Sequence, residues 1–342
     1  MRLSRAAFVA TLATAAGVGV PRAARADEKV RVGTAGLVSD APLFIAQARG
    51  YYKEQNLDVE FTNLESGAKM IAPLGTGEID AGAGAPSAAL YNAVLRGISI
   101  RVVSDKGRLS PGYGYNPLMV RKELMTSGRV KTYADLKGLR FASSATGAAG
   151  DSTLNEALKR GGIKYSDIKL PLIPFPSMIA AFANSAMDAA IVSEPFATQA
   201  IREGVAEMLA SSDKFYPNQQ IAVLLYGSKF IGDRPDVAKR FMIAYVKALR
   251  FYAGALKGGH FAGPNGPAVV AILQQFSVLK DPAVYAAMIP AGIDPNGYVN
   301  VASMNKDLDF WRGLNLIEGT ISAEQVVDIS FVRNANKVLG RG

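Results

Sequence analysis

The sequence has no cysteine and only one histidine, His260, among its 342 residues. Without cysteine, the chain lacks thiolate catalysis, dithiol redox chemistry and cysteine-ligated zinc or iron–sulfur sites. A single histidine is too few for a multi-histidine metal site and makes histidine-based acid–base chemistry hard to assemble. These absences favour binding over catalysis, and we expect no catalytic residue, no metal and no cofactor.

Charge is also limited, since 20% of residues are charged and 49% are hydrophobic. This is the composition of a globular protein, and the length predicts about two domains. Outside residues 1–26 the chain has 34 basic and 29 acidic residues, a net charge near +5. The basic residues form no run interleaved with aromatics, so we expect no nucleic-acid partner.

Residues 1–26 have the composition of an export signal. Four arginines and no acid surround the apolar stretch 6–20, and Ala24-Arg25-Ala26 supplies a cleavage site. The stretch is too short to span the ~30 Å hydrocarbon core of a membrane. We therefore expect cleavage and a mature chain that begins near Asp27.

The export route and the absence of a lipid anchor follow from single residues. Ala6 stands where the twin-arginine box requires its second arginine, which favours the general secretory route. A bacterial lipoprotein anchor requires cysteine, which is absent. We expect a protein that is free in the periplasm.

From Val30 onward, short apolar segments of period two alternate with longer helical segments, which predicts an α/β fold. The pattern occurs twice: Ile79-Asp80-Ala81-Gly82 matches Met187-Asp188-Ala189-Ala190 in character and position, which suggests two lobes built alike. We expect Asp80 and Asp188 to accept backbone N–H groups where their strands begin.

Loops rich in glycine, serine and alanine follow the predicted strands, and Pro86 and Pro195 open the helices after two of them. Proline is favoured in the first turn of a helix, where the neighbouring amides have no intrahelical partner. Two lobes that face each other across such loops would present helix N-termini and hydroxyl groups to a small anion.

Several residues admit more than one interpretation. Gly150-Asp151-Ser152 is similar to the start of a hydrolase motif, but Lys257 occupies the place of the aspartate before His260, and the first turn of a helix explains the motif better. Glu194 either caps a helix or points at a ligand donor. Tyr113 and Tyr115 lie in a loop that either contacts ligand or is plain surface, and Trp311 falls on a core pattern.

An ordered set of segments resembles the periplasmic solute-binding proteins of ABC importers, in the branch for sulfonates, nitrate, taurine and thiamine-pyrimidine precursors. The segments are Pro42-Leu43-Phe44-Ile45-Ala46, Gly50-Tyr51-Tyr52, Leu57-Asp58-Val59-Glu60, Gly77-Glu78-Ile79-Asp80-Ala81-Gly82, Ala134-Asp135-Leu136-Lys137-Gly138, Ser193-Glu194-Pro195-Phe196 and Ser322-Ala323-Glu324-Gln325-Val326-Val327-Asp328.

The resemblance implies a two-lobed periplasmic-binding-protein fold of type II, in which each lobe has a mixed sheet flanked by helices. Lobe 1 would comprise residues 27–117 and 221–342, and lobe 2 residues 118–220. The chain would cross between them near 117–120 and 221–225, where it is apolar and extended, and the lobes would close on ligand by a hinge motion.

The resemblance also implies ligand-binding positions in the loops that follow the strands. These positions are Thr34, Ala41, Ser66, Gly67, Ala85, Pro86, Ser87, Ser143, Ser144, Thr146, Gly147, Ser193 and Glu194.

The function implied is that of a monomeric substrate-binding component, which delivers a small organic solute to an ABC importer permease and its ATPase. The helix ends and hydroxyls favour a sulfonate or carboxylate. Glu194, if it faces the cleft, favours a pyrimidine or thiamine precursor instead. A periplasmic sensor input or a biosynthetic enzyme would also be compatible with this fold, although the lack of cysteine and histidine disfavours the enzyme.

Overall fold

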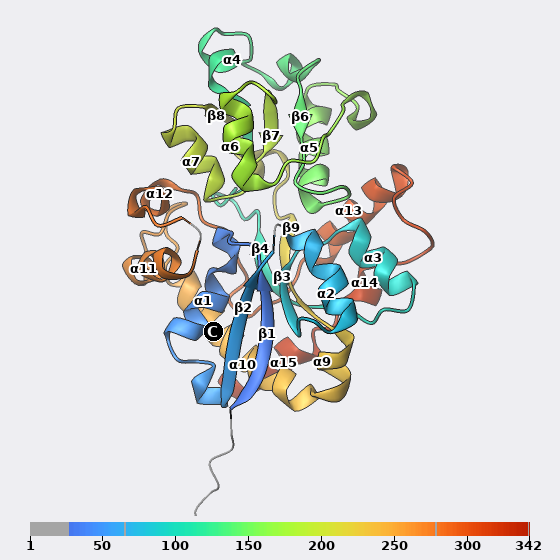
Figure 1. Ribbon diagram of the computed structural model, residues 1–342, viewed down its shortest axis with the longest axis vertical. Coiled ribbons are helices and arrows are strands. Elements are labelled where there is room, and N and C mark those ends of the chain that lie inside the picture. Colours follow the sequence, from blue (N-terminus) through green and yellow to red (C-terminus); the bar gives the residue numbers. More distant parts are fainter. Residues whose placement is uncertain (1–26, 65, 278, 341) are drawn as a thin grey trace, which may run out of the picture.

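The computed structural model describes residues 27–342 except 65, 278 and 341. The predicted export signal at 1–26 lies outside the described residues. The chain forms an α/β structure with two sheets, one in each half of the molecule shown in Figure 1. The predicted fold class is therefore confirmed.

The first sheet has five strands in the order β2-β1-β3-β9-β4 and the second has four in the order β6-β7-β5-β8. Both are mixed: β1 is parallel to β2 and β3 whereas β9 is antiparallel to its neighbours, and β6 is parallel to β7 whereas β5 is antiparallel to its own neighbours. The strands are β1 (Glu28–Thr34), β2 (Leu57–Asn63), β3 (Ala81–Gly84), β4 (Arg101–Arg108), β5 (Leu118–Arg121), β6 (Phe141–Ala142), β7 (Ala189–Ile191), β8 (Ala206–Ala210) and β9 (Gln220–Tyr226).

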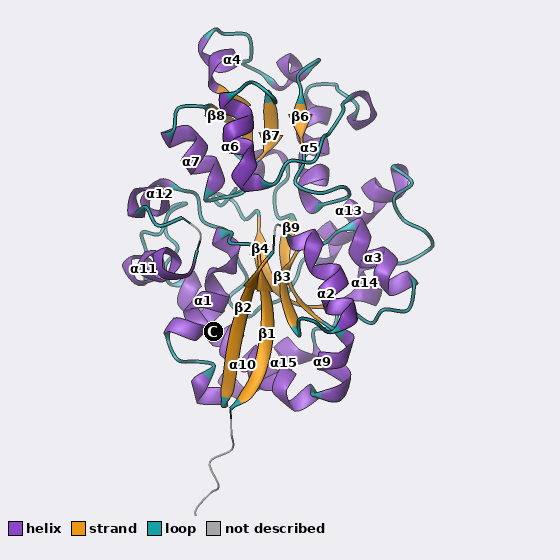
Figure 2. Cartoon of the chain, in the orientation of Figure 1, coloured by secondary structure: helices purple, strands orange, loops and turns teal. Residues whose placement is uncertain are grey.

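Helices flank both sheets, as Figure 2 shows. They are α1 (Ala41–Ala48), α2 (Ile71–Thr76), α3 (Ala88–Leu95), α4 (Lys122–Thr126), α5 (Ala149–Arg160), α6 (Phe175–Ala183), α7 (Phe196–Arg202), α8 (Ser212–Phe215), α9 (Ser228–Asp233), α10 (Pro235–Ala253), α11 (Gly266–Phe276), α12 (Pro282–Ala287), α13 (Val301–Gly313), α14 (Ala323–Val326) and α15 (Ser330–Leu339). Within the described part of the chain, none of the helices combines the length and the apolar composition that a membrane crossing requires.

The chain passes between the sheets at residues 109–117, between β4 and β5, and at residues 211–219, between β8 and β9. The expected crossings at 117–120 and 221–225 fall almost wholly in β5 and β9 instead. The sequence pattern was misleading because apolar extended residues occur inside the sheets, whereas the connecting residues include buried polar side chains such as Asn116 and Gln219. The expected lobe boundaries fall at the starts of β5 and β9; that each lobe moves as a unit stays a prediction.

The two similar segments of the sequence make the same local structure. Asp80 Oδ2 accepts the backbone N–H of Arg31 at 2.8 Å, and Asp188 Oδ2 accepts that of Arg140 at 3.0 Å. Each carboxylate also binds the guanidinium of that arginine, and the bond from Arg140 holds the pKa of Asp188 below its usual range. The expected backbone role of both aspartates is confirmed, and each one ties its strand to the neighbouring strand.

Candidate functional site

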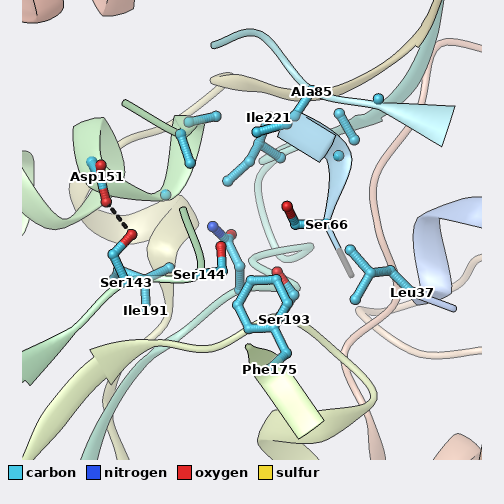
Figure 3. Close-up of a pocket in the computed structure, with 18 of the residues that line it drawn as sticks. Leu37, Ser66, Ala85, Ser143, Ser144, Asp151, Phe175, Ile191, Ser193 and Ile221 are labelled. Carbon is cyan, nitrogen blue, oxygen red and sulfur yellow. Dashed lines mark hydrogen bonds between the residues drawn. The ribbon is translucent and has the colours of Figure 1, made fainter. Parts of the chain in front are cut away.

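A cavity lies between the two sheets and is lined from both halves of the molecule. It has about 690 Å³ of space, counting the part that is open to solvent. In Figure 3, Ser66 and Phe175 point toward this space from opposite halves. The lining residues are Leu37, Ser66, Gly67, Ala68, Ala83, Gly84, Ala85, Lys106, Tyr115, Asn116, Ala142, Ser143, Ser144, Ala148, Ala149, Gly150, Asp151, Leu154, Phe175, Ile191, Ser193, Ile221 and Ala222.

Small residues allow the loops after β2 and β3 to meet at the cavity wall. A Cβ on Gly67 would lie 2.9 Å from the backbone nitrogen of Ala85 and 3.0 Å from the carbonyl carbon of Gly84. Real Cβ atoms do not approach a backbone so closely, and no side-chain movement would relieve the contact. Glycine at position 67 therefore determines how closely these two loops pack.

On the other side, Asp151 organises the loop that leads into α5. Its carboxylate accepts the hydroxyl of Ser143 at 2.5 Å and the backbone N–H of Gly147 at 2.9 Å. Burial raises the pKa of Asp151 to about 6, against the opposing effect of these hydrogen bonds. The loop is thus held so that Ala149 and Gly150, the first residues of α5, line the cavity, and amides in the first turn of a helix have no intrahelical partner.

Lys106 reaches the cavity from β4 and is fully buried. Its ammonium donates to Asp40 Oδ1 at 2.6 Å and to Ser39 Oγ at 2.9 Å, and Asp40 is also fully buried. The carboxylate of Asp40 therefore balances the positive charge of Lys106. An ammonium carries three N–H donors, so one donor of Lys106 has no protein partner among the described residues.

Asn116 and Ser66 are buried polar residues that line the cavity with unpaired atoms. Asn116 Oδ1 accepts the hydroxyl of Ser212 at 2.9 Å. This hydroxyl has no other acceptor among the described residues, so it donates to Oδ1 and leaves the amide NH₂ of Asn116 unpaired. Ser66 Oγ is likewise buried without a partner within the described part of the chain. Unpaired buried polar atoms are costly, which makes these two groups candidates for ligand contact.

The structure brings six of the expected positions to the cavity: Ser66, Gly67, Ala85, Ser143, Ser144 and Ser193. That they contact ligand stays a prediction.

The remaining seven expected positions are not part of the cavity lining. Thr34 lies at a separate hollow, Ala41 and Pro86 are buried, and Thr146 is exposed. Ser87 Oγ caps α3 by accepting the N–H of Leu90.

Gly147 and Glu194, the last two of the seven, make contacts between the lobes. The carbonyl oxygen of Gly147 accepts the N–H of Ala88 at 3.0 Å, and that of Glu194 accepts the N–H of Val38 at 3.1 Å. These seven positions were expected by analogy along the chain, whereas lining the cavity depends on the exact direction of each side chain.

The geometry of Glu194 matches the helix-capping interpretation. Its carboxylate accepts the backbone N–H of Thr198 at 2.9 Å, the Thr198 hydroxyl at 2.8 Å and the N–H of Ile289 at 3.4 Å. Burial raises the pKa of Glu194 to about 7. Both oxygens are thus occupied by protein donors, and the argument for a pyrimidine ligand loses its basis.

Several lining residues have only weak signals in the sequence. Lys106 lies in β4 beside other charged residues such as Asp105 and Arg108, and Asn116 precedes a proline in a connecting loop. Tyr115 lines the cavity, whereas Tyr113, from the same loop, does not. The apolar residues Leu37, Phe175 and Ile221 carry no signal that separates them from ordinary core residues. Trp311 is fully buried, as expected for a core residue.

A family model described as the NMT1-like family matches residues 23–258, more than half of the chain. A curated relative from Brucella abortus, named as a binding protein by inference only, is 27% identical over 207 residues, which cover 59% of this chain. The chain spans about 60% of the length of the curated relatives it matches.

Solved structures show the same fold at low sequence identity. The alkanesulfonate-binding protein SsuA from Xanthomonas axonopodis pv. citri, bound to MOPS, has a TM-score of 0.71 at 20% identity, covering 89% of this chain and 99% of its own. The periplasmic nitrate-binding protein NrtA from Synechocystis PCC 6803 has a TM-score of 0.75 at 15% identity, covering 91% and 89%.

The fold is not restricted to binding proteins. The desulfurization enzyme DszB has a TM-score of 0.62 at 14% identity, covering 91% of this chain and 99% of its own. The fold alone therefore does not distinguish a binding protein from an enzyme. That distinction has to be inferred from the side chains at the cavity.

Proposed function

The protein belongs to the NMT1-like family, and we propose that it is the periplasmic substrate-binding component of an ABC importer. In this role it captures a small organic anion, a carboxylate or a sulfonate, between its lobes and delivers it to the membrane permease and its ATPase. The observation that carries the proposal is the cavity itself, which residues of both halves and of the connecting segment 109–117 line. A cavity with apolar walls and a few polar groups suits a small organic molecule.

We further propose that residues 1–26 are removed on export and that the mature protein acts as a monomer free in the periplasm. The composition of this segment and the periplasmic location named for the nitrate-binding neighbour support the proposal.

The chemistry of the cavity supports binding without turnover. Its titratable side chains are Lys106, Asp151 and Tyr115, and each is tied into the protein: Lys106 pairs with Asp40, Asp151 anchors its own loop, and burial raises the pKa of Tyr115 far above neutral pH. In the part of the chain that the structure describes, no group of three or more histidine, aspartate or glutamate side chains is placed to hold a metal ion.

A thermal-shift screen of the chain from Asp27 onward tests this proposal. The panel contains aliphatic and aromatic carboxylates, sulfonates, taurine, nitrate and pyrimidines. A ligand at about 100 times its dissociation constant should add roughly 2.7 kcal/mol and raise the melting temperature by a few degrees.

Ligand recovered by mass spectrometry after incubation should be chemically unchanged. Conversion of the ligand to a product would contradict the binding role. It would indicate that the protein is an enzyme, as its structural neighbour DszB is.

A further inference from the structure

Building on the proposed function, we infer that the cavity selects an anion with a single oxygen-rich head, a carboxylate or sulfonate, on an apolar body without an ammonium group. The amide NH₂ of Asn116 and the hydroxyl of Ser66 hold the head. Asn116 is thus a specificity-determining residue that the sequence pattern does not reveal.

The two unpaired groups are the first argument. Asn116 is fully buried, and the bond from Ser212 to its oxygen fixes which end of the amide remains free. Ser66 Oγ is also buried and unpaired within the described residues. Both line the same cavity. A ligand oxygen that accepts from these groups would satisfy buried donors that have no partner among the described residues.

The other free polar groups at the cavity can also donate hydrogen bonds. Ser144 and Ser193 line it with hydroxyls that bond to no other described residue, and Lys106 contributes its third N–H. The amides at the start of α5 add a partly positive field. Free hydrogen-bonding capacity at this site therefore consists of groups that can donate, which suits a carboxylate or sulfonate.

No carboxylate among the described lining residues is free to pair with a ligand ammonium. Asp151 is the one carboxylate among the described lining residues, and its two oxygens bind Ser143 and Gly147. Asp40 lies behind Lys106 and is held by that lysine and by the N–H of Ala35. An ammonium inside the cavity would lose its hydration and would meet neutral hydroxyl groups but no free carboxylate, which disfavours zwitterions.

The remaining wall is apolar and sets the character of the ligand body. Leu37, Leu154, Phe175, Ile191 and Ile221 face the space from both halves of the molecule. An inorganic anion such as nitrate has no apolar part and would gain little from contact with this surface. An aliphatic chain or an aromatic ring fills the space and gains from burial.

Calorimetric titration with a matched series tests the inference. The probes are hexanoate, hexanesulfonate, benzoate, hexanamide, 6-aminohexanoate and nitrate. We expect binding of at least one apolar-bodied anion, and at least tenfold weaker binding of 6-aminohexanoate than of hexanoate. We expect no binding of nitrate.

Two variants test the roles of the donors. Asn116→Asp keeps an acceptor for Ser212 but turns a carboxylate toward the ligand, and it should weaken anion binding by about a hundredfold. Ser66→Ala should weaken it about tenfold. Ser277→Ala is the matched control, because Ser277 is a serine as buried as Ser66 that does not line this cavity, and it should leave the affinity unchanged. Far-ultraviolet circular dichroism and melting temperature report whether each variant is folded.

The outcomes separate this inference from the proposed function. Binding of 6-aminohexanoate or hexanamide as tight as that of hexanoate would overturn the selectivity while leaving solute capture intact. Unchanged anion affinity in both Asn116→Asp and Ser66→Ala would remove these residues from the site. Failure of every probe in the series would also overturn the selectivity, and the broader screen, with its pyrimidines and zwitterions, would then decide whether the protein captures any solute.

Discussion

Glu194 illustrates how burial changes what a single residue does. A carboxylate at the junction of a strand and a helix can face a ligand or bind the backbone, and here it binds Thr198 and the N–H of Ile289. Ile289 belongs to the first lobe and Glu194 to the second, so the side chain also joins the two halves. Its burial costs energy once it ionises, because the charged form loses water that three protein donors only partly replace.

The pH dependence of stability follows from this shift. Burial raises the pKa of Glu194 from 4.5 to about 7, so between these values the folded state binds more protons than the unfolded state. The free energy of unfolding therefore falls as pH rises from about 4.5 to 7 and stays low above that range. Asp105, Asp151 and Asp307, whose pKa values burial raises to about 6, act in the same direction.

We predict that Glu194→Gln flattens this decline by about 2 kcal/mol, because glutamine does not ionise. Urea unfolding at intervals from pH 4.5 to 8 measures the effect. Glu203→Gln, at an exposed position just after the same helix, should keep the wild-type pH profile. An identical pH profile in Glu194→Gln and wild type would show that Glu194 does not titrate in this range.

Among the elements, the loops at the ends of β2 and β3 show why small residues follow the strands. Their composition predicts close approach, and the structure shows that Gly67 packs directly on the backbone of Gly84 and Ala85. Because all three residues line the cavity, the spacing of these two loops also sets the shape of one cavity wall. Gly67 and Ala85 were expected at the site from the family resemblance, and the structure brings both to the cavity wall.

We predict that Gly67→Ala lowers stability by roughly 1–3 kcal/mol and weakens ligand binding, because the added methyl group forces the two backbones apart. Gly232→Ala is the matched control: Gly232 lies in α9 and its Cβ would meet nothing within 4 Å. That substitution should be neutral or stabilise by up to about 1 kcal/mol, because alanine is the better helix former. Equal effects of the two substitutions in thermal unfolding would contradict the close approach.

At the scale of the whole molecule, a buried carboxylate ties the lobes together on the side away from Glu194. Asp307 of α13 accepts the hydroxyls of Ser152 and Tyr216, each at 2.6 Å, and the amide of Gln219 at 3.0 Å. Ser152 lies in α5 of the second lobe, whereas Gln219 and Tyr216 belong to the segment that connects the sheets. The network therefore holds α5, α13 and one connection in a fixed relation, as their proximity in Figure 1 indicates.

We predict that Asp307→Ala lowers the free energy of unfolding by about 3 kcal/mol or more, because it leaves three buried donors without an acceptor. Asp309→Ala, on the exposed face of the same helix, should change it by less than about 0.5 kcal/mol. Denaturant unfolding of both variants at one pH measures the difference. A loss below about 1 kcal/mol in Asp307→Ala would mean that the network contributes little to holding the lobes together.

The sequence by itself determined the α/β class, the repeated strand–loop–helix unit and the loops from which the cavity is built. These follow from local rules: side-chain periodicity, the conformational freedom of small residues and the preference for proline at helix starts all act within a few residues. The resemblance to solute-binding proteins led to Ser66, Ser143, Ser144 and Ser193, which lie in loops that these rules place after strands.

Only the tertiary structure decided which polar groups are free to meet a ligand. Lys106 pairs with the carboxylate of Asp40, 66 residues earlier in the chain. The amide oxygen of Asn116 accepts the hydroxyl of Ser212, 96 residues later. One carboxylate oxygen of Glu194 accepts the N–H of Ile289, 95 residues away. Whether a buried group is paired depends on partners that only the folded chain brings together, and a pattern read along the chain contains no record of them.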